Sequence, residues 1–138
     1  MHVCWGNYEG PHHYDVPFAD IVDIIFSGRP ASISFEAANP RHAHEWALFK
    51  TLKLPEGKIL IPGVIESKSN FIEHPELIAN RISNYAKLVG RQNVIAGSDC
   101  GYGTWVGQAP SIQTLSGRNS GHSLKALVSP ASGFGNSS

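Results

Sequence analysis

The sequence predicts an α/β fold in which four parallel strands alternate with three helices. Four short apolar runs and three segments of helical periodicity follow one another in order, and their connections are short enough for right-handed parallel crossovers. A complete eight-stranded barrel of such units needs about 250 residues, whereas this chain has 138. We therefore expect part of a (β/α)₈ barrel, about four β/α units, with a bare strand edge at each end.

The four strands are expected at residues 1–5, 31–35, 58–65 and 93–97. The second is nearly all small or apolar, as is typical of a parallel strand that is buried on both faces. In the third, Pro62 and Gly63 predict a bulge or bend, because proline cannot donate a ladder hydrogen bond.

The three helices are expected at residues 17–26, 41–53 and 74–89. On the first, Ile21, Ile24 and Ile25 are predicted to share one apolar stripe. Gly28 ends this helix and Gly90 ends the third, as glycine commonly does.

Histidines away from the strand ends are expected to be ordinary surface residues. His42 and His44 would lie on the second helix, where positions two apart do not converge. The segment His12-His13-Tyr14-Asp15 could form a second polar cluster, but a solvated loop is the favoured interpretation.

Composition excludes several classes of function. The formal net charge is zero and 41% of residues are apolar, which indicates a globular protein with no nucleic-acid partner and no membrane partner. No apolar run is long enough to cross a bilayer and no signal peptide is visible. The two cysteines therefore predict reduced thiols in a cytoplasmic protein.

Four residues of metal-ligating type lie at the ends of three of the predicted strands. His2 and Cys4 are two apart on an extended segment, so their side chains point to the same face. Glu36 and Cys100 follow the second and fourth strands. Because parallel α/β folds gather ligands at this edge, the set predicts a Zn²⁺ site. From spacing alone the alternative stays open that both cysteines are small buried apolar residues.

Four motifs carry a resemblance to a known family. They are His2-Val3-Cys4-Trp5-Gly6-Asn7, Ile33-Ser34-Phe35-Glu36, Ile61-Pro62-Gly63-Val64 and Ser98-Asp99-Cys100-Gly101. With these motifs, residues 1–108 resemble the C-terminal catalytic barrel of cobalamin-independent methionine synthase, and more closely its short, single-barrel relatives. The resemblance implies the C-terminal half of a TIM (β/α)₈ barrel and a catalytic zinc held by His2, Cys4, Glu36 and Cys100.

The resemblance also implies a reaction. A methyl group would pass from a polyglutamylated methyl-tetrahydrofolate to the thiol of homocysteine, forming methionine, with the missing N-terminal half of the barrel as partner. Arg41 and Asp99 are weak catalytic candidates, through contacts with the substrate or with the metal ligands, and either could instead be a surface charge or a strand-end cap. The larger methionine synthases carry a histidine thought to relay a proton in the loop at 66–70, where this chain has Lys68.

Two other functions compete with methionine synthesis. One is a zinc-dependent alkyltransferase for a different thiol, resembling epoxyalkane:coenzyme M transferase, which shares the H-x-C pair and the later cysteine. The other is an incomplete, inactive product with no catalytic role. Substrate competition separates the first from methionine synthesis, and the flanking DNA tests the second.

Residues 109–138 differ in character from the rest. They are rich in Ser and Gly without apolar periodicity, which predicts a disordered tail. Members of the resembled family continue into a final helix. The same stretch of gene can be read in another frame, in which each codon takes the third base of one residue's codon and the first two bases of the next. That frame can encode an amphipathic helix of the family's kind, V-D-P-D-I-V-W-A-E-F-R-A-L-S-E-G-A-R-L-A-S-E-W-L-W. We expect the tail to be out of frame; an early stop in the other frame would contradict this.

Overall fold

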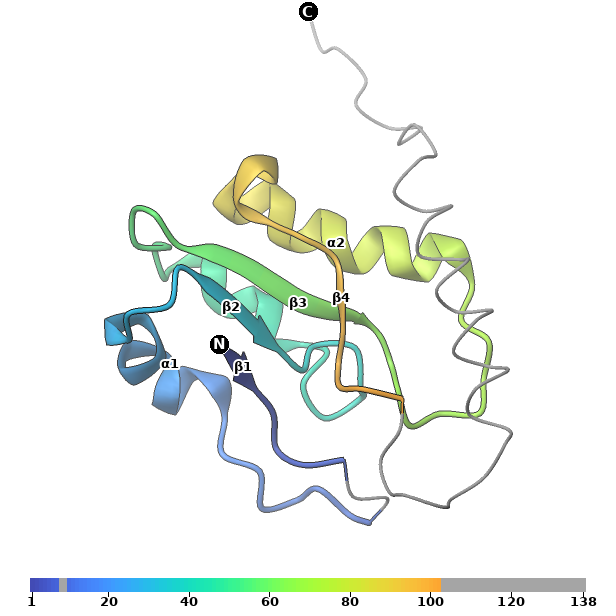
Figure 1. Cartoon of the computed structure of the whole chain (residues 1–138). Coiled ribbons are helices and arrows are strands. Elements are labelled where there is room, and N and C mark those ends of the chain that lie inside the picture. Colours follow the sequence, from blue (N-terminus) through green and yellow to red (C-terminus); the bar gives the residue numbers. More distant parts are fainter. Residues whose placement is uncertain (8–9, 103–138) are drawn as a thin grey trace, which may run out of the picture.

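Four strands pair in the order β1-β2-β3-β4, all of them parallel, in the computed structural model, which describes residues 1–7 and 10–102 (Figure 1). They are β1 (His2–Val3), β2 (Ser32–Phe35), β3 (Ile59–Ile65) and β4 (Gly97–Ser98). Between them lie helices α1 (Phe18–Ser27) and α2 (Pro75–Val89) and the 3₁₀ helices η1 (Glu45–Lys50) and η2 (Arg91–Asn93). This is an α/β arrangement consistent with part of a barrel. The predictions for residues 109–138 lie outside the described range.

The central strand β3 shows the irregularity that Pro62 and Gly63 predict. Its register with β4 shifts between Gly63 and Ile65, which is a bulge. The last strand is shorter than predicted, because Val94 makes only an isolated bridge to β3. Asn93, expected in the strand, ends η2 and donates a side-chain hydrogen bond to the carbonyl of residue 89, at the end of α2. Asn93 is therefore bonded to the end of α2 and lies outside β4.

Helix α1 forms where predicted, one residue later, but its buried stripe differs from the expected one. Phe18, Val22 and Ile25 are buried, whereas Ile24 is 74% exposed. At about 100° per residue, Ile24 lies about 120° around the helix from Phe18 and points away from the sheet. The prediction that Ile24 belongs to the buried stripe is therefore wrong.

Helix α2 matches its prediction at both ends. The Nδ1 atom of His74 accepts a hydrogen bond from the backbone N–H of Glu76 at 3.2 Å, which caps the N-terminus. Gly90 ends the helix with φ of 88°, in the region that favours glycine.

The helix predicted at residues 41–53 is wrong: the chain makes turns up to residue 44 and then the short 3₁₀ helix η1. Asn39 does cap this segment, since its Oδ1 accepts the backbone N–H groups of Arg41 and His42 at 3.1 Å each. Beyond the cap, the backbone N–H groups of Glu45 and Ala47 donate to carbonyls three residues earlier, which is 3₁₀ and not α-helical geometry.

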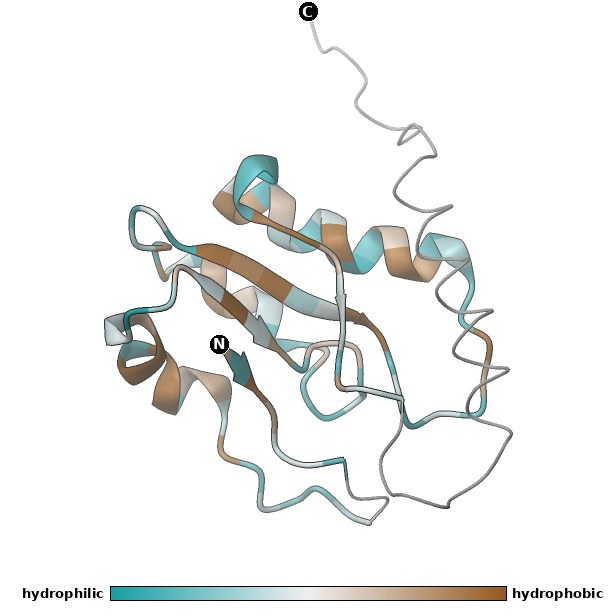
Figure 2. Cartoon of the chain, viewed as in Figure 1, coloured by the Kyte–Doolittle hydropathy of each residue, from teal (hydrophilic) through white to brown (hydrophobic). Residues whose placement is uncertain are grey.

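An aromatic cluster joins the sheet to its helices. The ring of Phe18 stacks on that of Phe35 with centroids 4.6 Å apart, and Tyr85 meets both Phe35 and Phe49 edge-on. Figure 2 shows the apolar residues concentrated along β3 and on α1. None of the helices in the described residues combines the length and apolar character that a bilayer crossing requires.

Candidate metal centre

The pairing of β1 with β2 positions the first two of the predicted ligands. His2 lies opposite Ser34 in the register, and the Ser34 hydroxyl contacts the Nδ1 atom of His2 at 3.1 Å. This contact turns the Nε2 atom of His2 toward the Sγ atom of Cys100, 3.9 Å away. Cys4 follows two residues later with its side chain exposed. Strand alternation therefore presents both His2 and Cys4 at one edge of the sheet.

The other two ligand candidates approach from the ends of β2 and β4. One ligand atom each from His2, Cys4 and Cys100 all lie within 4.8 Å of one another. The Sγ atom of Cys100 donates a hydrogen bond to Oε1 of Glu36 at 3.0 Å, and Glu36 is only 1% exposed. The structure thus brings together all four residues that the sequence singles out.

The electrostatics of this cluster favour a bound cation. Burial raises the pKa of the Cys100 thiol, and the Glu36 carboxylate and the Cys4 thiol raise it further. A bound cation would oppose this effect, because it stabilises the thiolate form of Cys100. One imidazole, two thiols and one carboxylate form a donor set that fits Zn²⁺.

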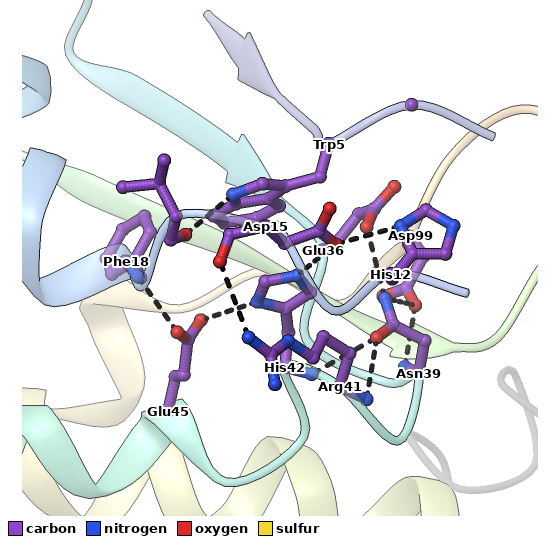
Figure 3. Close-up of polar contacts among 12 residues, drawn as sticks. Trp5, His12, Asp15, Phe18, Glu36, Asn39, Arg41, His42, Glu45 and Asp99 are labelled. Atoms are coloured by element: carbon purple, nitrogen blue, oxygen red, sulfur yellow. Dashed lines mark hydrogen bonds and ion pairs between the residues drawn. The ribbon is translucent and has the colours of Figure 1, made fainter. Parts of the chain in front are cut away.

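Asp99 holds the loop after β2 and, through it, Glu36. Its Oδ1 accepts the backbone N–H groups of Ala37 and Ala38 at 2.7 and 2.8 Å, and its Oδ2 accepts the backbone N–H of Asn39 at 2.8 Å. The side-chain nitrogen of Asn39 donates both to Asp99 Oδ2 and to Glu36 Oε2, each at 3.1 Å (Figure 3). Asp99 is therefore a cap at the end of β2 that also reaches the candidate ligand Glu36 through Asn39, and it is not a surface charge.

Burial shapes the chemistry of Asp99, which has no exposed surface. Burial raises the pKa of the Asp99 carboxyl and the nearby Glu36 adds to this, while the three backbone donors act in the opposite direction. The close approach depends on Gly63, because a Cβ atom there would lie 1.9 Å from Oδ1 of Asp99. Gly63 therefore serves the centre as well as the bulge.

His42 is buried, so its expected place on the surface is wrong. Only 2% of it is exposed, and its ring stacks on Trp5 with centroids 3.8 Å apart. Its Nδ1 faces Oε2 of Glu45 at 3.0 Å and its Nε2 faces Oδ2 of Asp15 at 3.1 Å. Burial alone would lower the pKa of His42, but the hydrogen bonds to Glu45 and Asp15 raise it. A carboxylate at each ring nitrogen favours the imidazolium form.

His12 and Asp15 belong to the same network, so the solvated-loop interpretation is wrong for them. The Nδ1 atom of His12 contacts Oδ2 of Asp15 at 2.8 Å (Figure 3). Burial opposes ionisation of Asp15, but its hydrogen bonds to His42 and His12 lower its pKa. The interpretation does hold for Tyr14, which is 87% exposed. The only sequence signals were the H-x-x-D and H-x-x-E spacings from His12 and His42.

A cavity of about 550 Å³ adjoins this network. Arg41 lines it with an exposed side chain, and Nη2 of Arg41 makes one long contact, 3.5 Å, to the carbonyl of Asp15. Lys68 lines it from the loop after β3. Asn39 also lines the cavity and reaches Glu36, so the cavity and the candidate metal centre share a wall.

Comparison with known proteins supports the fold. The chain is similar to a B12-independent methionine synthase from Shewanella sp. W3-18-1, solved in complex with selenomethionine, with a TM-score of 0.54 and 20% sequence identity. The match covers 80% of this chain and 31% of that protein, so the chain spans about a third of its length. No family model and no curated protein matches the chain. At this identity the likeness shows a shared fold.

Proposed function

We propose that the chain forms the zinc-binding half of a methyltransferase that moves a methyl group from methyl-tetrahydrofolate to the thiol of homocysteine, giving methionine. The observation that carries the proposal is the convergence of His2, Cys4 and Cys100 within 4.8 Å, with Glu36 bonded to Cys100. The fold shared with a B12-independent methionine synthase supports it. The remaining strands of the barrel would be supplied by the partner half.

Zinc held by His2, Cys4, Glu36 and Cys100 would act as a Lewis acid that lowers the pKa of a substrate thiol. The chain's own residues prepare the donors for that ion. The Ser34 hydroxyl orients the imidazole of His2, leaving Nε2 toward the cluster. The Asp99 and Asn39 pair fixes the carboxylate of Glu36.

A second candidate function is alkyl transfer to a different thiol. The loop at 66–70 bears on this choice, since it holds Lys68 where the larger methionine synthases carry a histidine, and this departure weakens the case for a methylfolate donor. A third outcome, an inactive product, would leave the ligand cluster without a reaction to serve.

Metal content tests the proposal directly. Protein purified without added chelator should carry about one zinc per chain, and Cys4→Ser and Cys100→Ser should each remove most of it, because each takes away one of four donors. His44→Ala is the matched control, since His44 is an exposed histidine outside the cluster. Equal metal content in the cysteine variants and the wild type would contradict the proposal.

Methyl transfer is then measured with the full chain mixed with the N-terminal half of the barrel as a separate polypeptide. Methionine formed from homocysteine supports the first candidate, and alkylation of another thiol in competition with homocysteine supports the second. Metal binding without transfer to any thiol supports an inactive product.

A further inference from the structure

The cavity beside the candidate metal centre is lined from three segments of the chain. Gly10 and His12 contribute from the loop after β1, residues 39–41 from the loop after β2, and residues 66–70 from the loop after β3. Asn39 joins the cavity to Glu36, and the Nζ atom of Lys68 lies 3.4 Å from the carbonyl of Gly6, two residues beyond Cys4. A ligand in this cavity would therefore lie next to the sulfur and carboxylate cluster.

Two cations line this cavity, and no carboxylate among residues 1–7 and 10–102 lies within ion-pair distance of either. The guanidinium of Arg41 has five N–H donors and uses one, in the 3.5 Å contact to Asp15. The ammonium of Lys68 has three donors, which contact Gly6 and, at 3.1 Å, the Nε2 atom of His12. Both cations therefore keep donors for a ligand.

The contact between Lys68 and His12 fixes the ammonium without neutralising it. The Nδ1 atom of His12 faces the Asp15 carboxylate, and because an ammonium group can only donate, Nε2 is the acceptor in the contact with Lys68. The Asp15 carboxylate is in turn paired with the buried His42. The network thus holds Lys68 in place while its positive charge stays at the cavity.

The one acidic residue in the lining is already satisfied. Glu66 is 6% exposed, and its two carboxylate oxygens accept the backbone N–H groups of Lys68, at 2.7 Å, and of Ser69. Both oxygens of Glu66 are thus engaged by backbone N–H groups, and this carboxylate makes no ion pair with the side chain of Lys68 among the described residues. With Arg41 and Lys68 positive, the cavity presents a net positive charge to its ligand.

We propose that this cavity binds the oxyanion of the thiol substrate, a carboxylate or sulfonate on a short aliphatic chain, through Lys68 and Arg41. The proposal rests on the proposed function for the position of the thiol. It adds that these two side chains recognise the anionic group of that thiol. Planar guanidinium and ammonium groups form charge-assisted hydrogen bonds with such oxyanions.

The test is equilibrium dialysis of the full chain, zinc-loaded and metal-free, against four probes. Two are anionic thiols, 3-mercaptopropionate and 2-mercaptoethanesulfonate, one is the neutral 2-mercaptoethanol, and one is thiol-free propionate. Zinc-loaded protein should bind at least one anionic thiol on the order of tenfold more tightly than the neutral thiol. The ratio between the two anionic thiols identifies carboxylate or sulfonate as the preferred group.

Lys68→Met and Arg41→Gln should each remove most of that preference, whereas Lys53→Met, which changes an exposed lysine outside the cavity, should keep it. Footprinting gives a second measurement: the bound anion should protect Lys68, and not Lys53, from acetylation detected by mass spectrometry. The proposed role of Lys68 would be overturned if the anion protected Lys68 in the wild type but Lys68→Met kept the preference for anionic over neutral thiols.

The outcomes separate this proposal from the proposed function. Equal binding of anionic and neutral thiols overturns the anion site while leaving the metal-dependent function in place. A second outcome is that propionate binds and protects Lys68, while every thiol probe binds metal-free and zinc-loaded protein equally well. This outcome supports the anion site and contradicts the proposed function. Binding of no probe overturns both.

Discussion

Asp99→Asn is the sharpest test of how the fold supports the candidate centre. The change keeps the shape but turns one carboxylate oxygen into an NH₂ group. If that group replaces Oδ1 it faces the N–H groups of Ala37 and Ala38, and if it replaces Oδ2 it faces both donors of Asn39. Either way two donors lose their acceptor. Hydrogen bonds to a charged group contribute about 1.5–3 kcal/mol each, so local stability should fall by about 3 kcal/mol or more.

Hydrogen exchange measured by mass spectrometry reports this loss directly. Amides 37–39 should exchange about 100-fold faster in Asp99→Asn, since 1.4 kcal/mol corresponds to about tenfold. Zinc affinity should fall by about 10- to 100-fold, because the carboxylate of Glu36 loses the support of Asn39. Asp23→Asn, at an exposed aspartate on α1, is the control. Unchanged protection of amides 37–39 would refute the role assigned to Asp99.

Three further predictions follow from the same geometry. Gly63→Ala should release amides 37–39 as Asp99→Asn does, because its Cβ would meet Oδ1 at 1.9 Å; Gly101→Ala, with no atom within 4 Å, should not. The pKa of His42 in the folded protein is raised above the ordinary histidine value of 6.5. The stability that charged His42 gives the fold is therefore complete below pH 6.5 and is lost as the pH rises through the folded-state pKa. Glu45, which pairs with His42, also accepts a hydrogen bond from the Phe18 amide. As pH rises, hydrogen exchange of this amide should therefore accelerate by more than the intrinsic pH dependence of exchange in the wild type, but not in His42→Gln. The isolated chain should associate in sedimentation experiments, and a monomer with cooperative unfolding would contradict this. The exposed apolar side chains behind this expectation are Ile24 at 74%, Phe71 at 80% and Ile95 at 50%.

The interior of the sheet and the ends of its best helix were predictable from local pattern. Apolar runs specify strands wherever both faces are buried, and the Pro62-Gly63 step specifies the bulge because proline lacks a donor. The cap at His74 and the stop at Gly90 act through backbone groups a few residues away. Such signals are contained in consecutive residues, and so they survive without knowledge of the fold.

The convergence of the four candidate ligands was also predictable, because parallel strands end at one edge and strand alternation sets the face. His2, Cys4, Glu36 and Cys100 are brought together by strand order, which short crossovers limit to a few possibilities. The short distance between Cys100 and Glu36, 3.0 Å, still depends on the hydrogen bonds by which Asp99 holds the loop after β2. Asp99 lies 60 residues away from Asn39 along the chain.

Tertiary structure alone decided the burial of His42 and the breakdown of the helix around it. Local rules place a histidine at that helix position on the surface, yet Trp5, Asp15 and Glu45 come from separate segments to cover and pair it. Asp99 fixes the backbone of the loop at residues 37–39, and the segment beyond this loop takes 3₁₀ geometry. The sequence by itself determined which backbone pieces form and which chemical groups end the strands. Partners distant in the chain decided which of those groups are buried, charged and held, because burial and pairing are properties of neighbours in space.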